Sequence, residues 1–185
     1  MPDVIFERWV PSTADTEELA DLLSGEEWPF HVTRSVSRER VLRLAATGYY
    51  DSAEARSFWI VADGKRSGLV RLMDLGDDIP MFDLRLVAAA RGQGTGLVAV
   101  RWLTGYLFTE YPAITRVEGT TRRDNTAMRR VFGRAGYVKE AHYRQSWQGQ
   151  GGELHDTIGY GILRADWEHG TTTAITWDDE PAGEP

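Results

Sequence analysis

The stretch "AAARGQGTGLVAV", residues 88–100, places glycine at every second position from Gly92 to Gly96 and then continues into aliphatic residues. The preceding "PMFDLRLV" (80–87) alternates as a strand does, and apolar residues in "LVAVRWLTGYLFTEY" (97–111) recur at helical spacing. The glycines therefore occupy a turn between a strand and a helix. Because glycine has no side chain, such a turn lets the backbone approach a ligand closely.

A turn of this kind indicates an anion site, because N–H groups at a helix N-terminus bind phosphate, helped by a partial charge of about +0.5. A P-loop requires Lys-Ser/Thr after its last glycine, where this chain has Leu97-Val98. A Rossmann fingerprint counted from Gly92 requires its third glycine at the position of Leu97. Its turn also follows the first strand of a domain, whereas about ninety residues precede this one. Both are poor matches.

The bulk composition is that of an ordinary globular protein, with 42% hydrophobic and 26% charged residues among 185. This length suits one domain with a real core. No apolar run approaches the roughly 18–20 residues of a membrane span, and the N-terminal residues do not resemble a signal peptide. Cysteine is absent, which excludes disulfides, a thiol nucleophile and cysteine-ligated zinc. We therefore expect a cytoplasmic protein.

The net charge of −7 has its origin near the C-terminus. Six acidic residues and no lysine or arginine follow Arg164, so residues 1–164 carry 21 basic and 22 acidic groups. No basic stripe with interleaved aromatic residues supports nucleic-acid binding. We expect a domain over residues 1–169 and an acidic tail over residues 170–185, onto which Trp177 could dock.

The remaining segments alternate so that the whole chain reads β-α-α-β-β-β-α-β-α-β-β. Asp63-Gly64 lies in a hairpin loop that we expect to be longer than two residues, and Asp124 is the expected N-cap of a helix. Besides 80–87 and 97–111, the expected strands are 4–10, 57–63, 68–75, 114–121, 137–148 and 153–164, and the expected helices are 12–25, 37–48 and 124–136.

Arg91-x-x-Gly94-x-Gly96 resembles the (Arg/Gln)-x-x-Gly-x-(Gly/Ala) acyl-CoA motif of the GNAT superfamily of N-acetyltransferases. A strand, Asn125 and a helix ending in "AGY" (135–137) follow, similar to the asparagine-containing helix of that family, which ends in Gly-Phe. The chain is therefore identified as a member of this superfamily.

The terminal pattern "EAHYRQSW…HDTIGYGILRADW" (140–167) is similar to the subgroup that acetylates N-termini of ribosomal proteins. The resemblance covers residues 57–167 and, more loosely, the two early helices. It implies an α/β fold with a mixed, largely antiparallel seven-stranded sheet flanked by about four helices.

The activity implied by this resemblance is acetyl-CoA-dependent N-acetyl transfer, by direct attack in a ternary complex. The acceptor is a protein N-terminus, an aminoglycoside or a small amine, and the protein is a monomer or homodimer without nucleic-acid or membrane partners. The alternative is a non-catalytic acyl-CoA-binding or regulatory module with the same fold.

The resemblance also implies a cofactor site at the strand end, the glycine turn and the next helix. Asn125 could instead simply begin its helix, and Arg91 could be a solvated surface residue. At most one of Arg122, Arg123, Arg129 and Arg130 is expected to meet the 3′-phosphate. The implied cofactor-binding residues are Leu86, Val87, Ala88, Arg91, Gly92, Gln93, Gly94, Thr95, Gly96 and Asn125.

Asp83 and Glu118 are the candidate catalytic bases, because they lie on the two strands that splay apart around the thioester in this family. Asp83 could instead pair with Arg85, which shares its strand face, and Glu118 could face solvent. Asp156 matches an acidic position of the subgroup, and its role could be structural.

Trp28, Phe30 and His31 lie in the loop 26–35, which covers the acceptor pocket in this family. They are the candidate substrate-binding residues, although aromatic residues in such loops also serve as core plugs. The four histidines show no metal-binding spacing, so we expect no metal.

The usual proton donors to the departing thiolate are missing. Phe132 stands where many family members have tyrosine, and Met128 where the ribosomal subgroup often has serine. Either solvent or a nearby tyrosine, Tyr137 or Tyr143, is expected to take this role.

Overall fold

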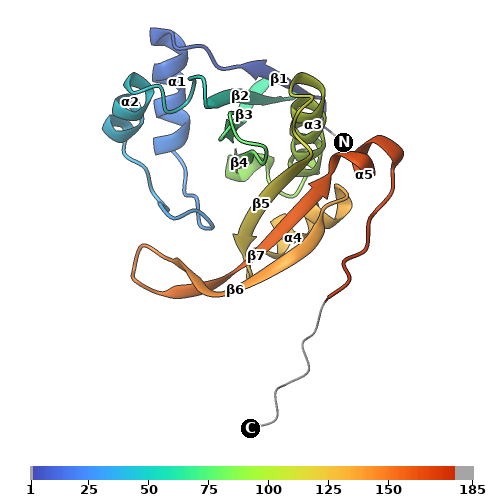
Figure 1. Ribbon diagram of the computed structural model, residues 1–185. Helices are drawn as coiled ribbons and strands as arrows, with labels where there is room; N and C mark the ends of the chain where they lie inside the picture. Colours follow the sequence, from blue (N-terminus) through green and yellow to red (C-terminus); the bar gives the residue numbers. More distant parts are fainter. Residues whose placement is uncertain (1, 178–185) are drawn as a thin grey trace.

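The structure is a computed structural model that describes residues 2–177 (Figure 1). The elements follow the predicted order, with a short 3-10 helix and a C-terminal helix in addition. They are β1 (Val4–Arg8), α1 (Thr13–Ser24), α2 (Arg38–Ala46), β2 (Ala55–Ala62), β3 (Lys65–Met73), β4 (Met81–Leu86), η1 (Ala88–Ala90), α3 (Thr95–Glu110), β5 (Arg116–Arg122), α4 (Thr126–Arg134), β6 (Val138–Gln148), β7 (Leu154–Leu163) and α5 (Arg164–His169).

The strands form two sheets, of order β1-β2-β3-β4 and β5-β7-β6. Every strand pairing found in residues 2–177 is antiparallel. β4 and β5 are thus the facing edge strands, and both lie near the middle of the molecule in Figure 1. They meet where the Glu118 N–H donates to the Pro80 carbonyl at 3.4 Å. The expected α/β fold is confirmed, with its sheet divided at this point.

The hairpin between β2 and β3 has a tighter turn than the sequence indicates. Asp63 and Gly64 have φ angles of 49° and 75°, and Ala62 pairs directly with Lys65. Two consecutive residues with positive φ are typical of a type I′ turn, whose twist suits antiparallel strands. The prediction of a longer loop was wrong because Lys65 and Arg66, although charged, begin β3.

Both faces of the first sheet are buried. Phe58 and Ile60 of β2 pack in the cluster that contains α3, whereas Trp59 and Val61 pack in the cluster that contains α1 and α2. Because successive strand residues point to opposite faces, one apolar run supplies both cores. Figure 1 shows α1 and α2 on one side of this sheet and α3 on the other. β4 and the start of α3 are thereby held on a rigid scaffold.

Helix α4 is held against the second sheet by Phe132. This ring is 1% exposed and stacks on Tyr160 of β7, with ring centroids 4.6 Å apart. Gly119 of β5 leaves the space for it, because a Cβ built at Gly119 would lie 2.6 Å from the Phe132 ring. This contact determines how closely α4 approaches β5.

The segment after β7 folds back onto the domain. Asp166 of α5 accepts hydrogen bonds from the hydroxyls of Thr171 and Thr173 and from the Thr173 N–H at 2.9 Å. Trp177 is 61% exposed and does not dock. The remainder of the expected acidic tail, residues 178–185, lies outside the described residues. Within residues 2–177, no helix has the length and apolarity needed to cross a bilayer.

We expect Gly119→Ala to lower the free energy of unfolding by about 1–3 kcal/mol, because the added methyl group overpacks Phe132. Urea denaturation followed by tryptophan fluorescence measures this change. Gly133→Ala in α4 is the matched control: a Cβ there meets no atom within 4 Å, and alanine favours the helix by about 1 kcal/mol. A Gly119→Ala protein as stable as the wild type would contradict the proposed packing.

Candidate active site

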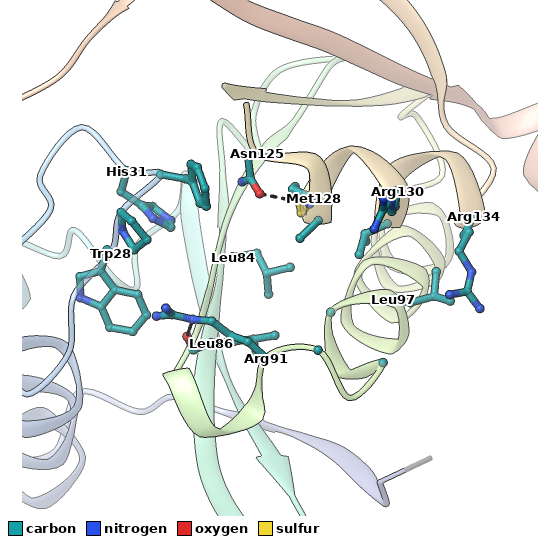
Figure 2. Close-up of a pocket in the computed structure, with 17 residues that line it drawn as sticks. Trp28, His31, Leu84, Leu86, Arg91, Leu97, Asn125, Met128, Arg130 and Arg134 are labelled. Atoms are coloured by element: carbon teal, nitrogen blue, oxygen red, sulfur yellow. Dashed lines mark hydrogen bonds between the residues drawn. The ribbon is translucent and has the colours of Figure 1, made fainter. Parts of the chain in front are cut away.

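A cavity of about 340 Å³ opens between β4, the glycine turn, α4 and the loop 26–35. Figure 2 shows Trp28 and His31 on one side of it and Arg130 and Arg134 of α4 on the other. The lining residues are Trp28, Pro29, Phe30, His31, Leu84, Leu86, Arg91, Gly92, Gly94, Gly96, Leu97, Asn125, Ala127, Met128, Arg130, Val131 and Arg134.

Three glycines of the turn, Gly92, Gly94 and Gly96, line this cavity. Gly92 and Gly94 have φ angles of 76° and 94°, which favour glycine. Gly94 is the N-cap of α3 and no side chain caps the helix, so the first N–H groups have no partner within it. A Cβ on Gly96 would lie 3.7 Å from side-chain atoms of Leu86 and Val131, which also line the cavity. The turn therefore has the form of an open anion site.

Arg91 joins this turn to two neighbouring segments. Its Nε donates to the Leu86 carbonyl at 2.8 Å, and its Nη2 donates to the Glu27 carbonyl at 2.9 Å. Figure 2 shows its side chain extending toward Trp28, whose ring centroid is 5.7 Å from the guanidinium carbon. Arg91 thus lines the cavity and also positions the loop 26–35.

The residues that the family resemblance assigned to the cofactor divide into two groups. Six line the cavity: Leu86, Arg91, Gly92, Gly94, Gly96 and Asn125. The other four have partners within the protein or are buried. The N–H groups of Val87 and Ala88 donate to the Ser67 carbonyl and the Glu26 carboxylate. Gln93 donates to the Ala89 carbonyl of η1, and Thr95 is buried.

Asn125 is the N-cap of α4 and also lines the cavity. Its Oδ1 accepts the Met128 N–H at 3.2 Å, and its Nδ2 donates to Thr121 Oγ1 at 3.0 Å. The expected N-cap, Asp124, lies one residue too early. The Asp124 carboxylate instead accepts hydrogen bonds from Arg122, and this competing partner was not visible in the sequence.

Two arginines of α4, Arg130 and Arg134, line the outer part of the cavity. Arg130 was one of four candidates for a phosphate contact, and the other three do not line the cavity. Arg134 was missed. Arg134 lies four residues after Arg130 and therefore on the same face of the helix. This spacing identifies it as a cavity residue only once the orientation of α4 is known.

His31 and Asp83, to which the sequence assigned different roles, form one hydrogen-bonded pair. His31 Nε2 lies 2.9 Å from Asp83 Oδ1, and Arg85 Nε donates to Asp83 Oδ2 at 3.0 Å. Both side chains of the pair are 24% exposed. His31 lines the cavity, and its Nδ1 is buried without a hydrogen-bond partner in the described part of the chain.

The surroundings of Asp83 determine which proton His31 carries. Burial raises the pKa of the Asp83 carboxyl, but the hydrogen bond from His31 and the charge of Arg85 outweigh burial and hold this pKa well below its usual range. The ionised carboxylate only accepts hydrogen bonds, so the imidazole donates through Nε2. In the neutral ring the lone pair is then on Nδ1. The pair therefore places a neutral imidazole at the cavity wall, with its unprotonated Nδ1 buried beneath the surface.

Glu118 is not brought to this cavity. Its carboxylate lies 2.6 Å from Arg116 Nη2, which also contacts Glu140 at 2.5 Å. Asp156 lies on β7, where it pairs with His142 at 2.8 Å. Within residues 2–177, no group of three or more His, Asp or Glu side chains could hold a metal ion.

Neither expected tyrosine lines the cavity. Tyr137 is buried in the core, where its hydroxyl lies 2.8 Å from that of Thr104 and burial raises its pKa. Tyr143 is exposed on β6. Phe132 is a core residue, whereas Met128 does line the cavity. Among residues 2–177, no tyrosine lines the cavity.

The loop 26–35 combines the two roles that the sequence left open for it. Trp28 is a buried core residue whose Nε1 donates to the Leu23 carbonyl at 3.0 Å. Its ring also meets His31 edge-on, with centroids 6.1 Å apart. Phe30 lies at the cavity beneath the guanidinium of Arg122, 5.4 Å from the ring centroid. The core contacts of Trp28 thereby determine where His31 stands.

The acetyltransferase (GNAT) domain family model matches residues 3–138. The chain therefore belongs to the GNAT acetyltransferase family. No curated protein sequence matches it closely enough to add to this assignment.

Solved structures agree on the fold. A probable acetyltransferase is 21% identical, with a TM-score of 0.74, covering 89% of this chain and 94% of that one. RimL, a ribosomal L7/L12 α-N-protein acetyltransferase in complex with coenzyme A, is 16% identical, with a TM-score of 0.75 and coverages of 86% and 93%. Spermidine N-acetyltransferase from Vibrio cholerae, in complex with CoA and spermine, is 16% identical, with a TM-score of 0.74 and coverages of 89% and 98%.

Because the pKa of Asp83 is lowered in the folded protein, its ionised carboxylate stabilises the fold, and we expect acid to remove this stabilisation by protonating it. A group with a lowered folded-state pKa stabilises the protein above its unfolded pKa, which is about 3.9 for aspartate. This contribution disappears as the pH falls from about 4 toward the folded-state pKa. Urea unfolding between neutral pH and pH ~3 should show a smaller acid-induced loss for Asp83→Asn than for the wild type. Asp78→Asn, in the exposed loop before β4, is the control, and equal losses in all three proteins would contradict the expectation.

Proposed function

We propose that the protein is an acetyl-CoA-dependent N-acetyltransferase that moves an acetyl group to a primary amine by direct attack while both substrates are bound. The observation that carries this proposal is one cavity with an uncapped helix start at one wall and the His31–Asp83 pair at another. The first suits an acyl-CoA and the second suits the removal of a proton from an amine. Membership of the family supplies the reaction class.

The residues present fit acetyl-CoA. The free N–H groups of the glycine turn suit a pyrophosphate, and Arg130 and Arg134 supply positive charge for a further phosphate. Leu84, Leu86 and Val131 provide apolar walls for the pantetheine arm beside the open edge of β4. When bound, acetyl-CoA supplies an acetyl group activated as a thioester, whose C–S bond breaks as the C–N bond forms.

His31 acts as the general base in this proposal. Its Nδ1, which is buried in the structure, has to be uncovered when the acceptor binds and then accepts the proton that the amine loses. Asp83 holds the imidazole in the required tautomer and stabilises the imidazolium. This changes the role expected for Asp83, which was itself a candidate base. Both carboxylate oxygens of Asp83 already accept hydrogen bonds, and its lowered pKa makes it a weak acceptor of a further proton.

Protonation of the leaving thiolate falls to solvent. Met128, at the cavity, has no proton to give, and Tyr137 is enclosed in the core. An ordinary thiol has a pKa of about 8.5, so a thiolate leaves without an obligatory acid.

The acceptor amine is proposed to meet Trp28, Phe30 and His31. A protein N-terminus, an aminoglycoside and a small amine are the candidate classes. The similar solved enzymes named above illustrate two kinds of acceptor, a ribosomal protein in one and a polyamine in the other.

Gly96→Leu should weaken acetyl-CoA binding at least about tenfold, or roughly 1.4 kcal/mol, because the new side chain fills the space between Leu86 and Val131. Isothermal titration calorimetry measures the affinity, and the melting temperature shows whether the fold survives. Gly105→Ala, on the same helix and away from the cavity, is the matched control. Unchanged affinity in a folded Gly96→Leu protein would overturn the placement of the cofactor.

His31→Gln should lower kcat/KM by about 10²–10⁴-fold and leave the Kd for acetyl-CoA near that of the wild type, because it removes the base and spares the glycine turn. Release of CoA, measured with a panel of short peptides, aminoglycosides and small amines, supplies the rates. His142→Gln, on β6 outside the cavity, is the control.

A protein that binds acetyl-CoA but releases CoA with no amine of the panel would favour the non-catalytic module instead. Full activity of His31→Gln on an identified amine would show that another group is the base.

A further inference from the structure

A second, smaller cavity lies beyond the His31–Asp83 pair, between α2, β3 and β4. Its volume is about 80 Å³, and its walls include Arg40, Arg71, Asp83 and Arg85. Asp83 lines this cavity, whereas its partner His31 lines the larger one. Each member of the hydrogen-bonded pair therefore lines one of two neighbouring cavities.

The smaller cavity carries an excess of positive charge. Three arginines line it against one carboxylate, and that carboxylate is bound by His31 and Arg85. Within residues 2–177, Arg40 and Arg71 have no carboxylate oxygen within 4.0 Å. The charge of these two side chains is thus not neutralised by the described part of the protein.

The arginine side chains around this cavity are fixed by neighbouring residues, but not all of their N–H groups have a hydrogen-bond acceptor. Arg85 Nη1 is buried without a hydrogen-bond partner among the described residues, on a side chain that is 15% exposed. Arg71 lies over the ring of Tyr49 at 3.6 Å and donates its Nε to the Tyr49 carbonyl at 2.7 Å. Burial raises the pKa of Tyr50 to about 12, so its hydroxyl keeps its proton. The Arg85 guanidinium also lies over the Trp28 ring, 5.3 Å from its centroid. The cations that remain for an anionic ligand are therefore those of Arg40 and Arg71.

We propose that this cavity binds a carboxylate of the acceptor, and that the acceptor is therefore an amine that also carries an acidic group. The inference rests on the proposed function, because it places the acceptor's amine at His31. A volume of 80 Å³ exceeds the ~30 Å³ that one water molecule occupies in the liquid, and a carboxylate fits within it. The planar guanidinium fork matches carboxylate geometry, whereas a polyamine meets like charge here.

The test compares matched acceptors. A series of ω-amino acids of increasing chain length is assayed for CoA release beside the monoamine and the diamine of each length. The C-terminally amidated peptides Ala-Glu-Ala and Ala-Gln-Ala form a second matched pair that differs only in the side-chain carboxylate, so the assay separates a free amino acid from an acidic protein N-terminus. In one of the two sets, kcat/KM should be at least about tenfold higher for the carboxylate-bearing acceptor. Diamines and spermidine should be the poorest acceptors.

Variants assign the effect to this cavity. Arg40→Gln combined with Arg71→Gln should raise KM about tenfold for the acidic acceptor and leave KM for its neutral partner and the Kd for acetyl-CoA unchanged. Arg40→Gln alone, on the exposed face of α2, keeps the test valid if the double variant folds poorly. Arg43→Gln, on the same helix and not lining the cavity, is the control.

If amines with and without a carboxylate are acetylated at equal rates, this inference is overturned and the proposed function stands. If no amine is acetylated, the proposed function fails, and calorimetric titration of the ω-amino acids, which needs no turnover, decides the question. Binding that weakens in Arg40→Gln then supports the carboxylate site, and absence of binding overturns it.

Discussion

The separation of β4 from β5 is the constraint on which the rest of this structure depends. Where the two edges meet, the Glu118 N–H reaches the Pro80 carbonyl at 3.4 Å, and each strand otherwise pairs within its own sheet. An unpaired strand edge exposes hydrogen-bonding groups that need a partner. Here one open edge lies beside a helix start without a side-chain cap and beside the wall formed by α4. In the proposed function, acetyl-CoA is the partner that such an edge lacks.

The cavity is held in shape by contacts that also belong to the core. Trp28 is buried against the helices α1 and α2. His31 in the same loop is thereby brought to β4, where it forms a hydrogen bond with Asp83. Arg91 joins the glycine turn to the same loop from the other side. Because a packed core tolerates little movement, these contacts place the imidazole with an accuracy that an exposed loop alone does not provide. The hydrogen bond from His31 and the charge of Arg85 outweigh burial and keep the pKa of Asp83 low, and the ionised carboxylate determines the tautomer of His31.

Much of the fold could be predicted, because the signals for it are local. The apolar run of β2 and the helical spacing in α3 are readable in short windows, and the structure forms a strand and a helix there. The two errors, the longer hairpin loop and the cap at Asp124, lie at element boundaries. There a charged residue continued a strand, or a neighbouring arginine captured the carboxylate. Local chemistry did not distinguish these outcomes.

By itself, the sequence determined the order of the elements, the family and the place of the glycine turn, because periodicity and glycine act on the nearest few residues. Only the tertiary structure decided that His31 meets Asp83, 52 residues away, and that Arg40 and Arg71 share a cavity with Arg85. It also decided that Glu118, which the sequence ranked beside Asp83, pairs with Arg116 instead. Contacts of this kind depend on how a loop and a helix pack against a sheet edge, and the burial that produces them involves residues far apart in the chain.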